Sequence, residues 1–231
     1  MFHNREDAAL QLAKELKSRS FQNLLVLAIP RGGVTIGSVR ARELGAELDI
    51  ILARKLRAPN QPEFAIGAVS ETGEVYLNEQ ADDALDGADD YLALEKRHQM
   101  QEIARRTRML RGAKPPLQIE GRSVIVTDDG IATGSTMIAA LKEVQLLQPR
   151  ELIVAVPVAA AESLKLVRIW ADDVVCLLSP EDFWAVGQYY EQFPPVEDEQ
   201  VVAMLNEAKL PPEVKHFAPA EARTADLGAG D

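Results

Sequence analysis

Short, continuous apolar runs recur along the chain, and between them apolar residues return at helical spacing. A continuous run indicates a strand buried on both faces, because such a strand has no solvent-facing side. These runs lie at residues 24–29, 48–53, 124–126, 152–156 and 174–178. Apolar residues that recur every three or four positions indicate amphipathic helices at residues 4–18, 34–44, 137–147 and about 161–169. This alternation predicts an α/β fold with a mainly parallel sheet flanked by helices.

Single residues mark ends of the first two helices. Asn4 is the expected N-cap of the first helix, because its side chain can accept a hydrogen bond from a free backbone N–H group. Gly45 follows the second helix, and glycine readily adopts the left-handed conformation that ends many helices. A last helix is predicted at about residues 198–208, and the Pro-, Ala- and Gly-rich residues 218–231 are expected to form a disordered tail.

The regular pattern breaks between residues 56 and 77, where prolines and glycines interrupt the apolar spacing. Short β-like pieces at residues 66–70 and 75–77 predict a hairpin within a mobile loop. Residues 79–111 are polar and charged, and their thin apolar periodicity indicates an insertion of two helices. The length of 231 residues suits a single domain at residues 1–217, with a core at about 20–180 and a small hood at about 181–217.

The composition is acidic, with 25 Lys and Arg residues against 36 Asp and Glu residues and a formal net charge of −11. General binding of nucleic acid or of an anionic membrane depends on excess positive charge, so we expect neither partner. The chain shows no apolar signal region at its start and no long apolar span, which favours a cytoplasmic protein. Its one cysteine, Cys176, cannot form an internal disulfide.

The candidate chemistry is concentrated in residues 124–136, Val-Ile-Val-Thr-Asp-Asp-Gly-Ile-Ala-Thr-Gly-Ser-Thr. The small residues between the strand and the next helix place backbone N–H groups at a helix N-terminus, which favours a bound phosphate. The carboxylates of Asp128 and Asp129 can accept hydrogen bonds from the vicinal hydroxyls of a ribose, or hold Mg²⁺ directly or through water. The stretch lacks the lysine of a Walker A loop and the GxGxxG of a dinucleotide site.

These thirteen residues resemble the phosphoribosyl pyrophosphate (PRPP) signature of the type I phosphoribosyltransferases. The resemblance implies the type I fold, with a small hood and a mobile loop, and Mg²⁺ as the cofactor. It also implies that Asp128 and Asp129 hold the ribose diol. The loop that holds the 5-phosphate is then formed by Gly130, Ile131, Ala132, Thr133, Gly134, Ser135 and Thr136.

Two further strand ends carry unusual residues, Pro30-Arg31-Gly32-Gly33 and Arg54-Lys55. Because ligands bind at the carboxyl ends of strands in open α/β sheets, these segments can offer a pyrophosphate cationic side chains and backbone that no side chain covers. The resemblance implies that Arg31, Gly32 and Gly33 form the loop that contacts pyrophosphate, with a cis peptide expected at Arg31–Gly32. Arg54 and Lys55 are similar to the basic pair that precedes the mobile catalytic loop of the family, here residues 56–75.

The implied reaction is displacement of pyrophosphate from C1 of PRPP by a nitrogenous acceptor, usually a nucleobase. Arg31, Arg54, Lys55 and Mg²⁺ offset the charge that develops on the leaving pyrophosphate, and the closed loop excludes water. Ala132 stands where the purine-6-oxo members carry a proton-accepting acid, so the signature is closer to the adenine and orotate members. Glu63 and Glu71 are then the candidates for the general acid or base.

The hood favours a different branch of the family. Phe183, Trp184 and Val186 follow the last core strand, which is where hypoxanthine–guanine members place the aromatic residue that stacks on the base. Trp184 is the first choice for that role and Phe183 the second, with packing of the hood as the other interpretation. The acceptor therefore stays open. Dimers are common in the family, so a homodimer is one expectation.

Two alternatives to transferase activity remain. The same fold also serves in regulators, where it senses PRPP or a nucleotide without turnover. A hydrolase or phosphorylase of a phosphoribosyl compound is the second alternative, and it should bind nucleotides while lacking affinity for PRPP.

Overall fold

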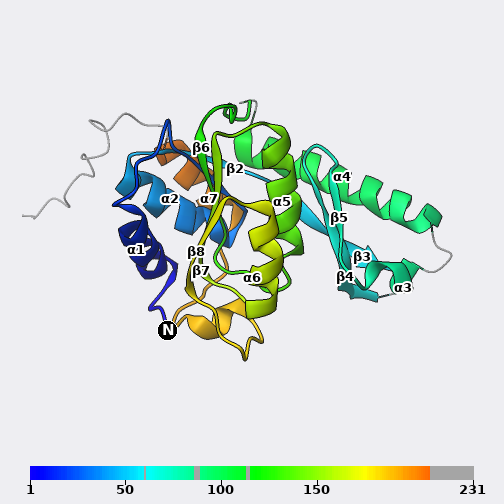
Figure 1. Ribbon diagram of the computed structural model, residues 1–231. Helices are drawn as coiled ribbons and strands as arrows, with labels where there is room; N and C mark the ends of the chain where they lie inside the picture. Colours follow the sequence, from blue (N-terminus) through cyan, green and yellow to red (C-terminus); the bar gives the residue numbers. More distant parts are fainter. Residues whose placement is uncertain (60, 86–88, 113–114, 209–231) are drawn as a thin grey trace, which may run out of the picture.

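The computed structural model describes residues 1–59, 61–85, 89–112 and 115–208 (Figure 1). The expected tail at residues 218–231 lies outside this part of the chain. Among the described residues, none of the helices is both long and apolar enough to cross a membrane.

The central sheet has the strand order β2–β1–β6–β7–β8, and every neighbouring pair is parallel. This confirms the predicted α/β fold, because apolar and β-branched runs were expected to form buried parallel strands. Ala28 of β1 lies opposite Thr127 of β6, so the segments after these two strands leave the same edge of the sheet side by side. The strands are β1 (Leu25–Ala28), β2 (Glu47–Ile50), β6 (Ser123–Thr127), β7 (Glu151–Val158) and β8 (Asp173–Leu178).

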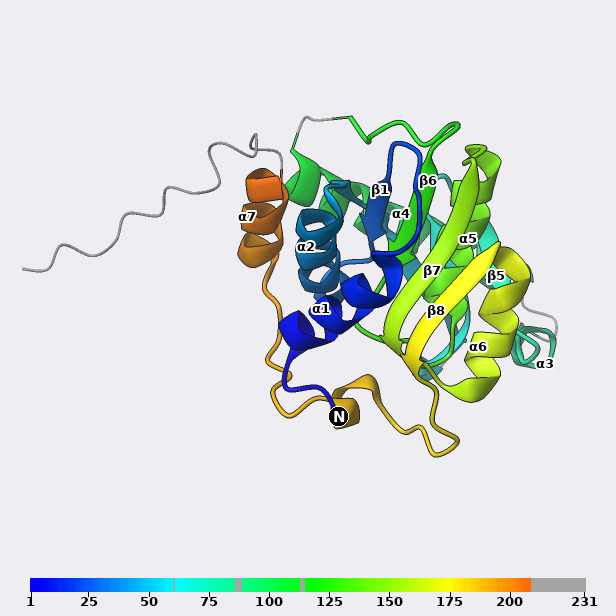
Figure 2. The same cartoon turned by 60° about the vertical axis from the view of Figure 1, so that its left-hand side comes forward.

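Helices cover both faces of this sheet. Figure 2 shows α1 (Arg5–Leu16) and α2 (Gly32–Leu44) on one side, and α5 (Ser135–Leu146) and α6 (Ala161–Val167) on the other. Alternate residues of β6 point to opposite faces, so Ile125 packs in one cluster with α1 and α2 while its two valine neighbours pack against α5.

The predicted helix ends are confirmed. The Asn4 side chain accepts a hydrogen bond from the Asp7 N–H group at 2.9 Å, and Gly45 adopts a left-handed φ of 65°. The last helix, α7 (Asp198–Ala208), buries Val201 and Leu205. It packs in one apolar cluster with residues of α2 and β2.

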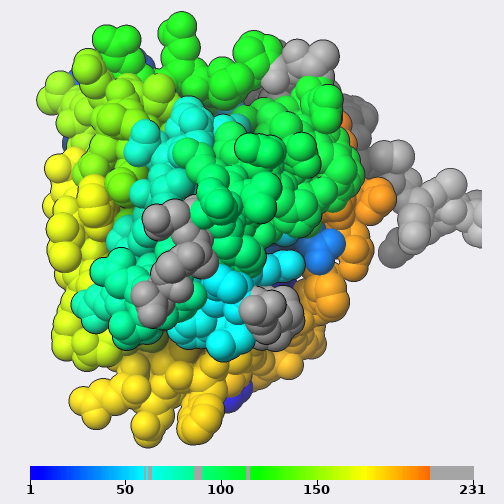
Figure 3. Space-filling model, turned by 90° about the vertical axis from the view of Figure 1, so that its right-hand side faces the viewer, coloured from blue at the N-terminus to red at the C-terminus, as the bar shows by residue number. Residues whose placement is uncertain are grey.

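A second, antiparallel sheet is formed by β3 (Ala53–Ala58), β4 (Gln61–Ser70) and β5 (Val75–Leu77). It is followed by α3 (Ala81–Leu85) and α4 (Asp89–Arg111), which confirms the two predicted helices. Figure 3 shows this layer from outside, with the green surface of α4 lying over the cyan strands. The hairpin is confirmed, but its strands extend through most of residues 56–75. The strands extend so far because Leu56 and Ile66 are fully buried in the cluster that includes Ile103 of α4.

Candidate active site

The loop after β1 turns directly beside the acidic pair. Ile29 donates its N–H to the Thr127 carbonyl at 2.9 Å, which continues the pairing of the two strands. A cis peptide joins Pro30 and Arg31, one bond before the predicted position. The predicted cis peptide, Arg31–Gly32, lies one bond further along the chain than the observed one. That bond is already at the start of α2, because Gly32 is the first helical residue and Arg31 is the N-cap in helical conformation.

Gly32 and Gly33 allow this close approach. A Cβ atom on Gly32 would lie 1.8 Å from Asp129 Oδ2, and one on Gly33 would lie 2.9 Å from the Cα atom of Asp128. Since side-chain Cβ atoms do not occur at such distances, the loop backbone can lie against the acids only where glycine is present.

The two carboxylates have different surroundings. Asp128 lines the open part of the site, and its Oδ1 accepts the N–H of Asp129 at 2.8 Å. Burial, followed by the neighbouring Asp129 charge, raises the pKa of Asp128 well above its ordinary value. Asp129 instead accepts a hydrogen bond at 2.8 Å from Nε of Arg5, in an ion pair whose side chains are 9% and 16% exposed.

Arg5 is held from several directions. Its Nη1 donates to the Pro194 carbonyl at 2.8 Å, and its guanidinium carbon lies 3.6 Å from the centre of the Phe193 ring. Tyr190 stacks on Phe193 at 4.9 Å and donates its hydroxyl to the Asp129 carbonyl at 2.6 Å. The first helix and the hood therefore fix the backbone and the carboxylate of Asp129 together.

Sequence reasoning missed Arg5. The available signal was its place on the buried face of α1, which also carries Ala8, Ala9 and Leu12. A charged residue on such a face requires a partner, because an unpaired buried charge is costly. The partner is 124 positions further along the chain, and only the fold brings the two together.

The predicted phosphate loop leads into α5. Gly134 is the N-cap residue, with a φ of 81° that favours glycine. The loop is fixed at its middle, because Ile131 donates its N–H to the Val158 carbonyl and accepts the Ala160 N–H, each at 2.9 Å. Ser163 also donates its hydroxyl to the Ala132 carbonyl. The N–H groups of the first helical turn have no partner within the helix, which leaves them for an anion.

Two adjoining cavities meet at Lys55, Asp128 and Thr136. The smaller cavity, of about 190 Å³, is lined by the phosphate loop and by Val186 of the hood. The larger, of about 390 Å³, has four cationic side chains in its lining: Arg54, Lys55, Arg57 and Arg106. One carboxylate, that of Asp128, thus lies between the predicted phosphate loop and a cationic wall.

Arg57 and Arg106 were not among the predicted site residues. Lys55 and Arg57 are two positions apart on β3, so strand periodicity is the signal that could have found Arg57. Arg106 comes from α4, whose orientation over β3 the sequence does not reveal. Burial, and then the charge of Arg106, lower the pKa of Arg54, whose Nε donates to Gln99 Oε1 at 2.7 Å.

Several predicted residues lie elsewhere. Arg31 pairs with Glu197 at 3.2 Å and is not in the lining of either cavity. Trp184 is 88% exposed, and Phe183 stacks on Tyr189 at 5.3 Å. Both aromatic residues are absent from the lining of the two cavities, to which the hood contributes Val186.

Of the two glutamates predicted for acid–base chemistry, the structure describes the side chain of Glu71 but not that of Glu63. Glu71 accepts hydrogen bonds at 2.7 Å from the Leu52 N–H and from Nη1 of Arg111, and it lines another cavity. The structure therefore does not bring Glu71 to this site. The side chain of Glu63 lies outside the described residues.

The acidic pair fits a magnesium ion that is held chiefly by its substrate. Among the described residues, no three His, Cys, Asp or Glu side chains are grouped to hold a metal. Mg²⁺ usually keeps several waters and binds one or two carboxylates together with substrate phosphates. Asp128 is a half-buried carboxylate that faces the cavities, so it suits that mode of binding.

A parallel five-stranded sheet flanked by helices, with an acidic pair and a small-residue loop after β6, has the type I phosphoribosyltransferase fold. A family model described as "Phosphoribosyl transferase domain" matches residues 2–194. The chain belongs to this family.

Relatives agree with this assignment. Two curated proteins from Mycobacterium tuberculosis strains, each with a provisional phosphoribosyl transferase name, are 38% identical over 211 residues, or 90% of this chain. The chain spans about half of their length, 47%. A crystal structure of a Thermus thermophilus protein, TT1426, is 43% identical, with a TM-score of 0.76. That match covers 89% of this chain and 98% of the Thermus chain.

Proposed function

We propose that the protein transfers the 5-phosphoribosyl group of Mg–PRPP to a nitrogenous acceptor, with release of pyrophosphate. The observation that carries this proposal is the position of Asp128, which lines both the cavity of the phosphate loop and the cavity with the cationic wall. PRPP has the same order of groups: a 5-phosphate, a ribose diol and a pyrophosphate.

Each part of PRPP has a counterpart in the site. The 5-phosphate binds the N-terminal turn of α5, where Thr133 and Thr136 add hydroxyl donors. The ribose diol donates to Asp128, while Arg5 holds Asp129 in place behind it. The pyrophosphate lies over the backbone of Gly32 and Gly33 and toward the cationic wall.

The reaction breaks the bond between C1 and the pyrophosphate oxygen and forms a bond between C1 and the acceptor nitrogen. Pyrophosphate leaves with the electron pair, so the four cations of the wall stabilise the charge that develops on it. Asp128 would hold a bound Mg²⁺, which would supply further neutralisation of the charge on the leaving group. Holding both reactants in line can lower the activation barrier by about 7–11 kcal/mol. For the proton that the acceptor loses, Glu63 stays the predicted base.

The acceptor binds above the ribose, beside Val186. This residue is close to the signature, because a Cβ atom on Gly130 would lie 2.5 Å from Val186 Cγ1. A nucleobase suits a wall of this kind, since an aliphatic side chain can pack on its flat face. We therefore assign the packing role to Val186 in place of Trp184.

Release of pyrophosphate from Mg–PRPP, measured across a panel of nucleobases, tests the proposal. Transferase activity predicts release that depends on one base and on Mg²⁺. PRPP binding without release for any base would instead favour the sensing module. Binding of nucleoside monophosphates without affinity for PRPP would favour the hydrolase or phosphorylase.

A further inference from the structure

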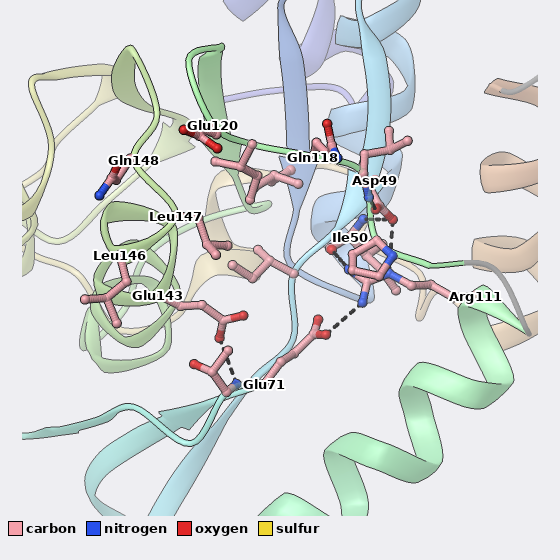
Figure 4. A pocket seen from close by; sticks show the side chains of 16 residues that line it. Asp49, Ile50, Glu71, Arg111, Gln118, Glu120, Glu143, Leu146, Leu147 and Gln148 are labelled. Carbon is pink, nitrogen blue, oxygen red and sulfur yellow. Dashed lines mark hydrogen bonds and ion pairs between the residues drawn. The ribbon is translucent and has the colours of Figure 1, made fainter.

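A separate cavity of about 660 Å³ lies between the C-terminal end of α5, the end of α4 and residues 116–120 (Figure 4). Leu27 and the segment Asp49–Ile51 also line it. This volume is within the range of about 300–1,000 Å³ that is common for small-molecule sites. It shares no lining residue with the two cavities of the candidate active site.

Among the described residues that line this cavity, the one cation is already engaged. Arg111 donates from Nε to Asp49 Oδ1 at 3.2 Å and from Nη1 to Glu71 Oε2 at 2.7 Å. Its Nη2 donates to the Ile50 carbonyl. Because all three of these nitrogens are in use, Arg111 neutralises its own partners and is not a binding group for an anion.

The charge that remains is negative. Glu143 is only 6% exposed and points into the cavity in Figure 4. In the described part of the chain it has no ion pair, and its hydrogen bond comes from the Thr72 N–H at 3.2 Å. Burial raises the pKa of Glu71, Arg111 lowers it, and the charge of Glu143 adds a smaller upward effect. The two carboxylates therefore repel each other, and a cation placed near both would relieve the repulsion.

The walls between the acids are aliphatic. Figure 4 shows Glu120 well separated from Glu143, with Leu147 between them in this view. The described residues of the lining include no aromatic residue and offer these aliphatic side chains: Leu27, Ile50, Ile51, Leu117, Ile119, Leu146 and Leu147. Such walls suit a chain of methylene groups, whereas the carboxylates suit ammonium groups at its ends.

We propose that this cavity binds an aliphatic polyamine. One ammonium group lies between Glu143 and Glu71, the methylene chain lies over Ile51 and Leu147, and the far ammonium group faces Glu120. The site is independent of PRPP binding, so failure of either proposal leaves the other standing.

Calorimetric titration of the full chain with spermidine tests this site. In about 150 mM salt the Debye length is about 8 Å, so diffuse attraction to an acidic protein is weakened. We expect one saturable site. Glu143→Gln keeps an acceptor for the Thr72 N–H but removes the charge, and it should weaken binding about tenfold, as expected for one charge-assisted hydrogen bond. The matched control is Glu162→Gln, because Glu162 is an 84% exposed helical glutamate outside the cavity.

A second variant tests the cavity without touching its charges. Leu147 is 42% exposed at the end of α5, so Leu147→Trp should be tolerated while filling the space between the acids. It should reduce spermidine binding at least as much as Glu143→Gln, and it keeps the test valid if that variant fails to fold. The proposal is overturned if the native chain shows no saturable site, if Leu147→Trp leaves binding unchanged, or if the Glu143 and Glu162 variants weaken binding equally.

Discussion

The cavities on the two sides of the β2–β3 connection have opposite charge. Ile51 lines the acidic cavity, and the next residue, Leu52, lines the cationic one. In the described part of the chain, the acidic cavity presents four carboxylates and one guanidinium, while the cationic cavity presents four cations and Asp128. The overall charge of −11 therefore says little about the local field that a ligand meets. An acidic protein can bind a polyphosphate when its fold gathers a few cations on one wall.

The largest effect is expected from removing the two carboxylates of the candidate active site. Asp128→Asn combined with Asp129→Asn should abolish Mg–PRPP binding in a calorimetric titration, because the ribose diol and the metal lose the negatively charged carboxylates and keep only neutral amide oxygens. Asp82→Asn with Asp83→Asn is the matched control, since this adjacent acidic pair is exposed on α3. Unchanged binding in the first double variant would refute the ribose assignment.

Arg5→Met should lower the free energy of unfolding by about 3–5 kcal/mol, because it leaves Asp129 buried without its cation. Denaturant unfolding measures this change. Arg19→Met is the control, because Arg19 pairs with Asp173 through side chains that are 37% and 43% exposed, and it should cost less than about 1 kcal/mol. Equal losses in the two variants would mean that Asp129 does not depend on Arg5.

Arg106→Gln should weaken PRPP binding about tenfold, since one charged contact to the pyrophosphate is lost. Ribose 5-phosphate lacks the pyrophosphate, so its affinity should stay the same. The neighbouring residue supplies the control: Arg105 is 55% exposed and pairs with Glu102, and Arg105→Gln should leave both affinities unchanged. Equal weakening of both ligands by Arg106→Gln would place Arg106 away from the pyrophosphate.

The smallest effect is expected at Trp184. Because its side chain is 88% exposed, Trp184→Ala should change the unfolding free energy by less than about 0.5 kcal/mol. It should also leave acceptor binding intact, whereas Val186→Ala should weaken it. Titration of each variant with the acceptor shows which of the two side chains contacts it. A large loss of acceptor affinity in Trp184→Ala alone would mean that Trp184 stacks on the acceptor.

The sequence predicted features that depend on neighbouring residues. The strand runs, the Asn4 N-cap, the Gly45 helix end and the order of strand, acids, loop and helix in residues 123–146 all follow from local patterns. The partners of those features did not follow. The Arg5–Asp129 pair joins residues 124 positions apart, and the entry of Arg106 into the cavity depends on how α4 crosses β3.

The aromatic residues illustrate the same limit. An aromatic cluster after the last strand predicts a hood, but its spacing does not tell which member faces the ligand. In the structure the ring of Phe183 stacks on Tyr189, and the ring of Tyr190 contacts the rings of Phe193 and Phe2. That internal stacking leaves the aliphatic Val186 to line the cavity.

The central claim is that the acidic pair, the phosphate loop and the cationic wall form one PRPP site. Calorimetric titration of the native protein with PRPP, in the presence and absence of Mg²⁺, tests it most directly. The structure predicts saturable binding at one site per chain, tighter with Mg²⁺ and progressively weaker as salt is raised. Absence of binding under both conditions would contradict the claim and would mean that the loop at residues 130–136 holds the phosphate of a different ligand.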